Sequence, residues 1–258
     1  KPSEEEKLGV PHYMIDVAEP DAEYSVSNYR DEALPIVERY VNEGKIPVIC
    51  GGTGFYINSL LFDLSYGCVA ADPAVREKFM KLAEERGKEY LYGLLKECDP
   101  QSAEKLHPND LKRVVRALEI YHSGGRKKSE LCDGNKKRFD YLAVAIDYPR
   151  EELYARIDRR VDIMFERGLV DEVKSLFARG IDENCRSMQA IGYKEVLEGL
   201  KNDSLQSTMR DIIKQNTRHY AKRQYTFFNH QLPVVWFETD YSNFNNTVEK
   251  VINYIENN

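Results

Sequence analysis

The chain has 258 residues, of which 42% are hydrophobic and 31% are charged, and its formal net charge is −6. This composition is typical of a folded globular protein and excludes a disordered chain, and the length corresponds to one large domain or two smaller ones. No apolar run is long enough to span a membrane, and the acidic balance excludes a protein whose whole surface is basic, although a local basic groove remains compatible with it.

The cysteines and the first residues indicate the compartment of the protein. An odd number of cysteines without any CxxC pair predicts neither a disulfide framework nor a cysteine-rich zinc site, and it favours the cytosol. The five are Cys50, Cys68, Cys98, Cys132 and Cys185. The chain opens on KPSEEEKLGVPHYMID, without Met and without a signal peptide, so we expect further residues before Lys1.

In the first quarter of the chain, apolar spacing predicts a helix over residues 26–41, capped by Ser25 or Ser27 and ended by Gly44. Residues 45–50 (KIPVIC) predict a short buried strand. A Gly-rich turn (51–54, GGTG) and an amphipathic helix (55–64) follow. The order helix, strand, turn, helix predicts an α/β fold with a parallel sheet covered on both faces.

A charged stretch from Asp72 to about Arg138 predicts two helices, over residues 73–86 and 111–122, and we interpret residues 69–138 as a helical insertion domain. Residues 139–147 return to the sheet. A long helix from Pro149 to near Gly180, a helix over 205–228, a strand over 233–237 and a helix over 246–255 complete the chain. The predicted α/β core therefore consists of residues 1–68 and 139–258.

The GGTG turn is the first candidate for chemistry. In a Gly-rich turn before a helix, backbone N–H groups and the positive helix end point at a ligand, and Thr53 adds a hydroxyl. The same turn is equally compatible with a plain connection between two elements.

The helix over residues 111–122 is the second candidate. Arg113 and Arg116 lie on one face beside Lys112, and three cations in the first turns oppose the helix dipole. An anion bound there would offset that cost. The alternative is a solvated charged face paired with Glu119.

The long helix from Pro149 carries Arg156 and Arg160 one turn apart, beside its apolar stripe. An arginine in this position can reach into a cleft and hold a diphosphate with two parallel hydrogen bonds. The alternative is an ion pair within the helix, with Glu152 or Asp158.

The late helix carries a basic stripe at i, i+4 and i+8, formed by Lys214, Arg218 and Lys222, with Arg223 alongside. Aromatic residues interleave with these cations. Cations for phosphates and aromatic rings for bases suit single-stranded RNA, whereas the alternative places the aromatic residues in the core. The five histidines form no metal constellation, and no Walker A, G-x-S-x-G or H-E-x-x-H sequence occurs.

Taken in order, nine segments resemble signatures of the tRNA dimethylallyltransferase (tRNA isopentenyltransferase) family over nearly the whole chain. They are KPS, PHYMID, YSVSNYRDEAL, GGTGFYINSLL, ADPAVR, LHPNDLKRVVRALE, RIDRRVD, SMQAIGYKE and NTRHYAKRQYTFF. The resemblance implies a P-loop-kinase-like core with an insertion that closes over the anticodon arm. It also implies transfer of a dimethylallyl group from dimethylallyl diphosphate to N6 of adenosine 37 in tRNAs reading codons that start with U. An adenylate isopentenyltransferase of cytokinin type and a tRNA-binding remnant without catalysis remain alternatives.

The same resemblance implies roles for individual residues. Thr53 and Arg160 are expected to be catalytic, and Gly51, Gly52 and Arg160 to bind the diphosphate donor. The residues expected to bind RNA are Thr53, Arg76, Lys112, Arg113, Arg116, Gln189, Gly192, Tyr193, Lys194, Arg218, Lys222 and Arg223.

The family's P-loop, of the ATP-binding type, and its catalytic Asp would precede the KPS segment, and neither occurs in these 258 residues. We therefore expect the ligands of Mg²⁺ to lie before Lys1 and the chain as written to be inactive. The expected partners are the tRNA anticodon stem-loop and dimethylallyl diphosphate, with no membrane partner, for a cytoplasmic monomer.

Overall fold

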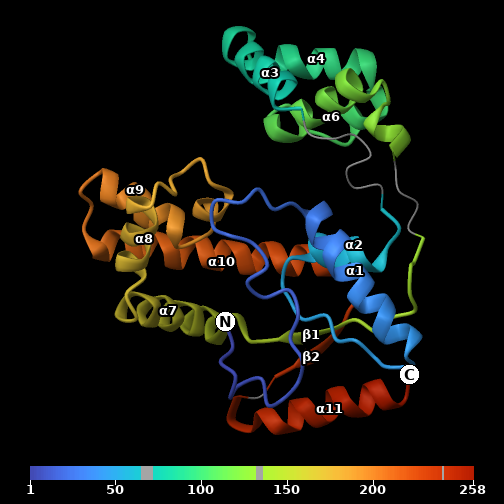
Figure 1. Ribbon diagram of the computed structural model, residues 1–258, viewed down its shortest axis with the longest axis vertical. Coiled ribbons are helices and arrows are strands. Elements are labelled where there is room, and N and C mark those ends of the chain that lie inside the picture. The colour runs from blue at the N-terminus through green and yellow to red at the C-terminus, as the bar shows by residue number, and fades with distance from the viewer. Residues whose placement is uncertain (65–71, 132–135, 240) are drawn as a thin grey trace. The chain divides into compact units, whose positions relative to one another are not determined.

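The computed structural model describes residues 1–64, 72–131, 136–239 and 241–258 (Figure 1). The chain divides into two compact units. Unit 1 comprises Lys1–Asn58 and Asp140–Asn258, and unit 2 comprises Ser59–Phe139. The domain limit at 68–69 lies outside the described residues, as do Cys68 and Cys132, so the limits deduced from the sequence stay a prediction.

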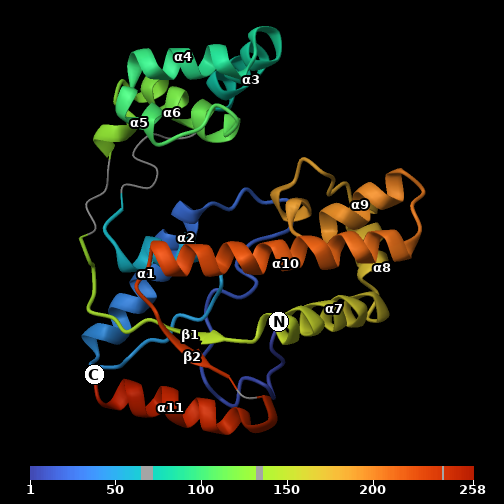
Figure 2. The same cartoon turned by 180° about the vertical axis from the view of Figure 1, so that it is seen from behind.

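A small parallel sheet lies in unit 1. Strands β1 (Val144–Asp147) and β2 (Val235–Glu238) pair along their whole length, with Val144 opposite Val235 and Asp147 opposite Glu238. Figures 1 and 2 both show the sheet between helices α10 (Gln206–His230) and α11 (Phe244–Glu256). The predicted α/β class with parallel strands is thereby confirmed.

The strand predicted at residues 45–50 is wrong. These residues belong to no strand in the described chain, and the side chains of Ile46 and Val48 are 83% and 87% exposed. An apolar, β-branched run forms a strand only where a neighbour completes its backbone hydrogen bonds, and β1 and β2 pair with each other instead.

The single helix predicted from Pro149 to Gly180 is also wrong. The structure has two helices there, α7 (Arg150–Glu166) and α8 (Leu169–Ala178), separated at Gly168, whose φ of +91° no helix interior accepts. One apolar stripe runs through both because they pack on the same core. That core includes Val161, Phe165, Val173, Met188, Val196 and Ile213.

The remaining helices of unit 1 are α1 (Val26–Asn42) and α9 (Tyr193–Lys201), with short 3-10 turns at Arg186–Gln189 and Tyr241–Asn243. Helix α2 (Gly54–Leu61) runs across the division between the units. Ser25 caps α1, because its hydroxyl accepts from Asn28 N–H while its own N–H donates to the Asn28 side chain.

Unit 2 is helical, with α3 (Pro73–Arg86), α4 (Lys88–Cys98), α5 (Pro100–Glu104), α6 (Leu111–Gly124) and a 3-10 turn at Lys128–Leu131. The two helices predicted there are present, whereas helices α4 and α5 were not predicted from the sequence. Asp72 caps α3 by accepting from two backbone N–H groups, and Pro73 occupies the first turn, where its missing N–H costs nothing. The core gathers Phe79, Leu91, Leu95, Val114 and Leu118.

The two ends of unit 2 are joined at a neck. Phe62 and Lys137 form an antiparallel bridge, the N–H of Asp63 donates to the carbonyl of Lys136 at 2.9 Å, and the N–H of Arg138 donates to the carbonyl of Leu61 at 2.7 Å. The entering and leaving segments of the unit are therefore neighbours. Over the described ranges, no helix combines the length and the apolar character that crossing a lipid bilayer requires.

Candidate functional site

The GGTG turn lies against one face of α10. The Thr53 hydroxyl is 3.2 Å from the Tyr220 hydroxyl, and the Gln224 side-chain amide donates to the carbonyl of Gly52 at 2.9 Å. A Cβ atom on Gly54 would overlap the ring of Phe227, so only glycine fits this approach. The turn is thus fixed by side chains that recur along one face of the helix, at i, i+4 and i+7.

The contact with α10 determines which groups of the GGTG turn remain exposed to a ligand. Thr53 is exposed and stands at the start of α2, so its hydroxyl, already oriented by Tyr220, can accept from or donate to an incoming group. Gly51 is exposed with open space around it. On α10, the Arg223 guanidinium lies over the Tyr220 ring at 5.7 Å, which places a cation beside the threonine.

The opposite face of α10 is tied to α7 by ion pairs. Lys214 Nζ lies 2.8 Å from Asp162 Oδ1, and Arg218 bonds to Asp158. Two of the three cations in the predicted basic stripe are therefore neutralised between the helices, and only Lys222 lacks a carboxylate partner from α7. Asp158, one of the two carboxylates that the sequence offered as a partner within α7, is engaged by Arg218.

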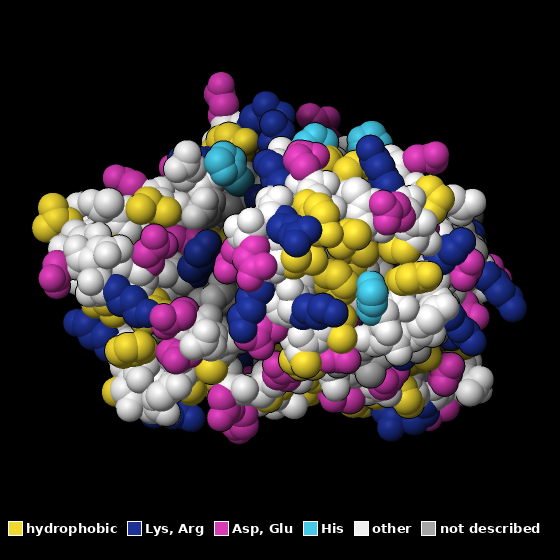
Figure 3. Space-filling model, turned by 90° about the horizontal axis from the view of Figure 1, so that it is seen from above, with side chains coloured by type: hydrophobic (Ala, Val, Ile, Leu, Met, Phe, Trp, Pro, Cys, Tyr) yellow, Lys and Arg dark blue, Asp and Glu magenta, His cyan; other side chains and the backbone are white. Residues whose placement is uncertain are grey.

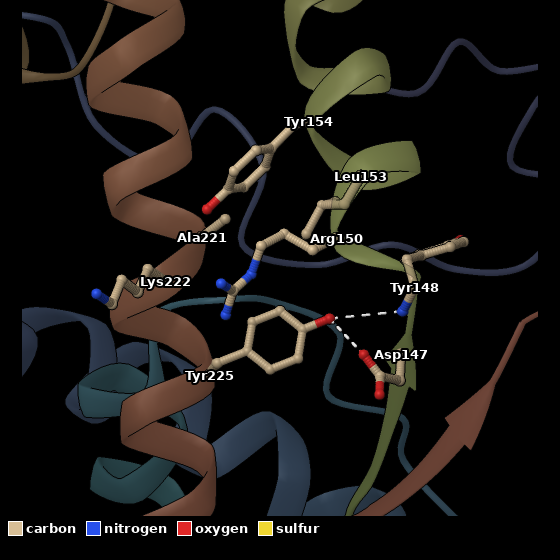
Figure 4. Close-up of a pocket in the computed structure, with 8 residues that line it drawn as sticks. All are labelled: Asp147, Tyr148, Arg150, Leu153, Tyr154, Ala221, Lys222 and Tyr225. Atoms are coloured by element: carbon tan, nitrogen blue, oxygen red, sulfur yellow. Dashed lines mark hydrogen bonds between the residues drawn. The ribbon is translucent and has the colours of Figure 1, made fainter.

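A pocket of about 130 Å³ opens beyond the last of these ion pairs, where β1 ends and α7 begins (Figure 4). Its walls are Asp147, Tyr148, Arg150, Leu153, Tyr154, Ala221, Lys222 and Tyr225. Of these residues, only Lys222 was expected from the sequence to have a functional role, as an RNA contact. The detectable signal of the pocket was Asp147, an acidic residue at the carboxyl end of a parallel strand, where ligands bind in open α/β sheets.

The Tyr225 hydroxyl donates to Asp147 Oδ1 at 2.6 Å, and the tyrosine ring stacks on Trp236 with centroids 4.9 Å apart. Burial, reinforced by the hydrogen bond to Asp147, raises the pKa of Tyr225 to about 12. The phenol therefore stays protonated at neutral pH and holds the wall of the pocket in place.

Arg160 is exposed on α7, and no described contact joins it to the GGTG turn or to the pocket. It lies one turn before Met164, whose methyl group contacts the position that a Cβ on Gly192 would occupy. Arg160 therefore lies on the same side of α7 as Met164.

The segment around Gly192 divides into supporting and exposed residues. Gly192 has a φ of +102°, and its N–H donates to the buried Glu195 at 2.7 Å. The Tyr193 hydroxyl donates to Glu172 at 2.7 Å, and burial together with this bond raises the pKa of Tyr193 to about 12. Gln189 and Lys194 are exposed, and the side-chain amide of Gln189 donates to the carbonyl of Glu183 at 2.5 Å.

In unit 2, two predicted RNA contacts meet on one carboxylate. Glu119 is fully buried; it accepts from the N–H of Asp72 at 2.7 Å and from Arg76 at 3.1 Å, and it forms an ion pair with Arg116 at 3.1 Å. Burial alone raises the pKa of Glu119, but the bonds from Asp72, Arg116 and Arg76 outweigh it, so this pKa lies below its ordinary value.

The side chains of Arg76 and Arg116 remain 45% and 30% exposed while they hold Glu119. Lys112 is exposed, and Arg113 is 70% exposed and 3.3 Å from Asp110. The space-filling view shows Lys and Arg side chains interspersed with Asp and Glu side chains over the visible face (Figure 3). Anions would therefore be attracted by local clusters and not by one continuous positive surface.

Among the residues that the structure describes, no three His, Cys, Asp or Glu side chains are grouped so that they could hold a metal ion. The Mg²⁺ that the resemblance implies therefore finds no ligand set in these residues.

Comparisons with known proteins agree with one another. A sequence model of the IPP transferase family matches residues 1–231. The tRNA dimethylallyltransferase of Acetivibrio thermocellus is 41% identical over 257 residues, covering 98% of this chain and 82% of that protein. The tRNA dimethylallyltransferase of Bacillus cereus is 42% identical over 259 residues, covering 99% of this chain and 80% of that protein.

Solved structures give the same result. The tRNA isopentenylpyrophosphate transferase of Bacillus halodurans is similar with a TM-score of 0.70 and 35% identity, over 100% of this chain and 81% of that chain. A eukaryotic dimethylallyltransferase acting on tRNA is similar with a TM-score of 0.82 and 30% identity, over 100% of this chain and 67% of that chain.

Proposed function

This chain belongs to the IPP transferase family and is a dimethylallyl transferase that acts on tRNA; we propose that its target is N6 of adenosine 37 in tRNAs reading codons that start with U. Its fold is the P-loop-kinase-like α/β fold of that family. The observation that supports the proposal most directly is the Thr53 hydroxyl, oriented by Tyr220 at the start of α2.

The reaction uses dimethylallyl diphosphate as donor. A bond forms between N6 of the adenine and the allylic carbon, the bond from that carbon to the diphosphate oxygen breaks, and N6 loses a proton. We assign Thr53 to hold and polarise N6 and Arg160 to stabilise the charge on the leaving diphosphate. We assign Gly51 and Gly52 to the donor; Gly51 has open space beside its backbone, whereas the Gln224 side chain fills the corresponding space at Gly52.

The tRNA is assigned to the exposed cations. In unit 2 these are Lys112 and Arg113 together with the pair held on Glu119, and in unit 1 Arg223 and Lys194 are available. Such contacts with phosphates fix the position of an RNA without reading its sequence. An enzyme for free adenylate has no use for exposed cations spread over both units, which favours tRNA as the substrate.

Further parts of the proposal lie outside the described contacts. Mg²⁺ would neutralise the diphosphate when bound, and no step above is routed through it. We further propose that the protein works as a cytoplasmic monomer on the anticodon stem-loop.

The test is a transfer assay with dimethylallyl diphosphate and an anticodon stem-loop RNA, in which prenylated adenosine is measured by mass spectrometry. Thr53→Val removes the hydroxyl at nearly constant volume, and we expect transfer to fall about tenfold to a thousandfold while RNA affinity is retained. Thr208→Val, an exposed threonine on α10, is the matched control. Full transfer by Thr53→Val would exclude the role of this hydroxyl.

The substrate and the extent of the chain are tested in the same assay. Excess AMP should not compete with the stem-loop, and competition would favour the adenylate enzyme instead. Turnover by the purified 258-residue chain would refute the prediction that the chain as written is inactive.

A further inference from the structure

One face of α10 contacts two segments of unit 1 that are expected to meet the substrate, the GGTG turn and the segment around Gly192. Tyr220, Gln224 and Phe227 contact the GGTG turn, and Asn216 lies one turn before Tyr220. At about 100° per residue, these four side chains fall within about 80° of the helix circumference. Figures 1 and 2 both show α10 extending from α9 to α2, so one helix spans both segments.

Asn216 reaches the turn at Gly192 through a buried carboxylate. Its side-chain amide donates to Glu195 Oε1 at 2.7 Å, and the N–H of Gly192 donates to Glu195 Oε2 at 2.7 Å. Glu195 is 7% exposed, so its oxygens depend on these protein donors more than on water. The carboxylate therefore acts as a bridge that sets where the Gly192 turn lies relative to α10.

The two turns are fixed at neighbouring points of one helix. Asn216 and Tyr220 are four residues apart, which corresponds to about 6 Å along the axis of α10. The segment that ends at Gly192 is also fixed near its start, where Met188 is fully buried in the core of unit 1. Between these two anchors, Gln189 is exposed. The position of this exposed residue relative to the GGTG turn is therefore set largely by α10.

We propose that Asn216 is a positioning residue: by holding Glu195, it keeps the Gly192 turn in register with the GGTG turn, and this register gives the protein its preference for adenosine at the target position. The proposal rests on the function proposed above, because it requires both turns to meet the same base. Polar groups distinguish two bases only when they are placed precisely, and a misplacement of roughly 1 Å can cost about a hundredfold in rate. Without Asn216, one buried oxygen of Glu195 loses its donor, so the carboxylate and the turn that it holds shift.

A role confined to stability is the alternative. In that case the bond between Asn216 and Glu195 only ties α9 to α10, and its loss lowers the melting temperature and weakens all RNA binding to the same extent. A positioning role changes which base is preferred. The ratio of affinities for two bases therefore separates the two roles.

Base preference is measured by fluorescence anisotropy, as the ratio of the affinities of the 258-residue chain for two anticodon stem-loops that carry adenosine or guanosine at the target position. Asn216→Leu removes the donor at similar volume and should lower this ratio about tenfold or more. The slope of log affinity against log salt concentration should not change, because the phosphate contacts are retained. Gln215→Leu, which removes an exposed amide at the adjacent position of α10, is the matched control and should keep the parent ratio.

Exchanging the two partners provides a rescue. Asn216→Asp alone sets two carboxylates against each other and should lose the preference as Asn216→Leu does. Combining Asn216→Asp with Glu195→Gln restores both hydrogen bonds, because the new amide can donate to the new carboxylate and still accept from the N–H of Gly192. This double variant should recover most of the parent ratio.

The outcomes separate this proposal from the proposed function. A parent chain without a preference for adenosine would refute the proposed target and the positioning role together. A parent preference that Asn216→Leu retains, or an equal loss of affinity for both stem-loops, would overturn the positioning role alone, and so would a double variant no better than Asn216→Asp. Thermal melting verifies that each variant is folded, and if Asn216→Leu does not fold, Asn216→Ala takes its place in the same comparison.

Discussion

Replacing Glu119 by alanine should destabilise unit 2 while leaving the stability of unit 1 unchanged. The carboxylate is fully buried, accepts from one backbone N–H at 2.7 Å and from Arg76 at 3.1 Å, and forms an ion pair with Arg116 at 3.1 Å. Removing one side of a buried ion pair costs about 3–5 kcal/mol, because charges and donors are left without partners. Since Arg76 and Arg116 are partly exposed and can regain water, we take the lower end, about 3 kcal/mol.

That loss translates into a large thermal shift. Ser59–Phe139 falls in the size class in which 1 kcal/mol lowers the melting temperature by about 4–8 °C, so Glu119→Ala should lower the melting temperature of unit 2 by about 12–24 °C. The matched control is Glu84→Ala, at an exposed position of α3, which should change the free energy of unfolding of unit 2 by less than about 0.5 kcal/mol.

The position of the single tryptophan makes the assay selective. Trp236 lies in unit 1, so its fluorescence follows that unit, whereas far-UV circular dichroism follows the helices of both. In urea, Glu119→Ala should show an early dichroism transition and an unmoved fluorescence transition. If both transitions move together, or if Glu119→Ala behaves like Glu84→Ala, then Glu119 does not hold unit 2 together and the reasoning is refuted.

Two further predictions use the same measurements. The pKa of Glu119 is lowered on folding, so its stabilising contribution is present above the unfolded pKa of about 4.5 and is lost as the pH falls through the lower folded value. The dichroism transition of unit 2 should therefore move to lower urea concentration in acid, below about pH 4.5. In Glu119→Gln this pH-dependent movement should be smaller. Gly54→Ala places a methyl group against the Phe227 ring and should destabilise unit 1 by about 1–3 kcal/mol, measured in the Trp236 fluorescence transition. Adding Phe227→Leu to the same chain should recover part of the lost stability. A Gly54→Ala chain as stable as the parent would show that the turn does not need this glycine.

Local signals were sufficient where a helix carries its own start and stop. Helix α3 was predicted to the residue, because Asp72 and Pro73 mark its first turn and Gly87 its end. The break at Gly168 was not predicted, because the apolar period continues through it. Periodicity reports the face that packs on the core, and two successive helices can share one face.

The strand expected at residues 45–50 is a case in which local sequence signals were not sufficient. Composition shows that a segment is suited to a sheet, but the strands next to it decide whether it pairs. Pairing between distant residues is likewise invisible in one sequence: nothing local reveals that Arg76 and Arg116 meet on Glu119. The same holds for the pairs of Lys214 with Asp162 and of Arg218 with Asp158, which account for two of the three cations in the basic stripe.

The hydrogen bonds that join the first and last segments of unit 2 have a consequence for the order in which the two units fold during synthesis. Unit 2 is one uninterrupted stretch whose first and last segments are hydrogen-bonded to each other, through Asp63 with Lys136 and Leu61 with Arg138. Unit 1 is formed by two separate stretches of the chain, and β1 can pair only after β2, near the C-terminal end, has been synthesised. On the ribosome, the insert can therefore close before its host does, and the host is completed only when its second half has emerged.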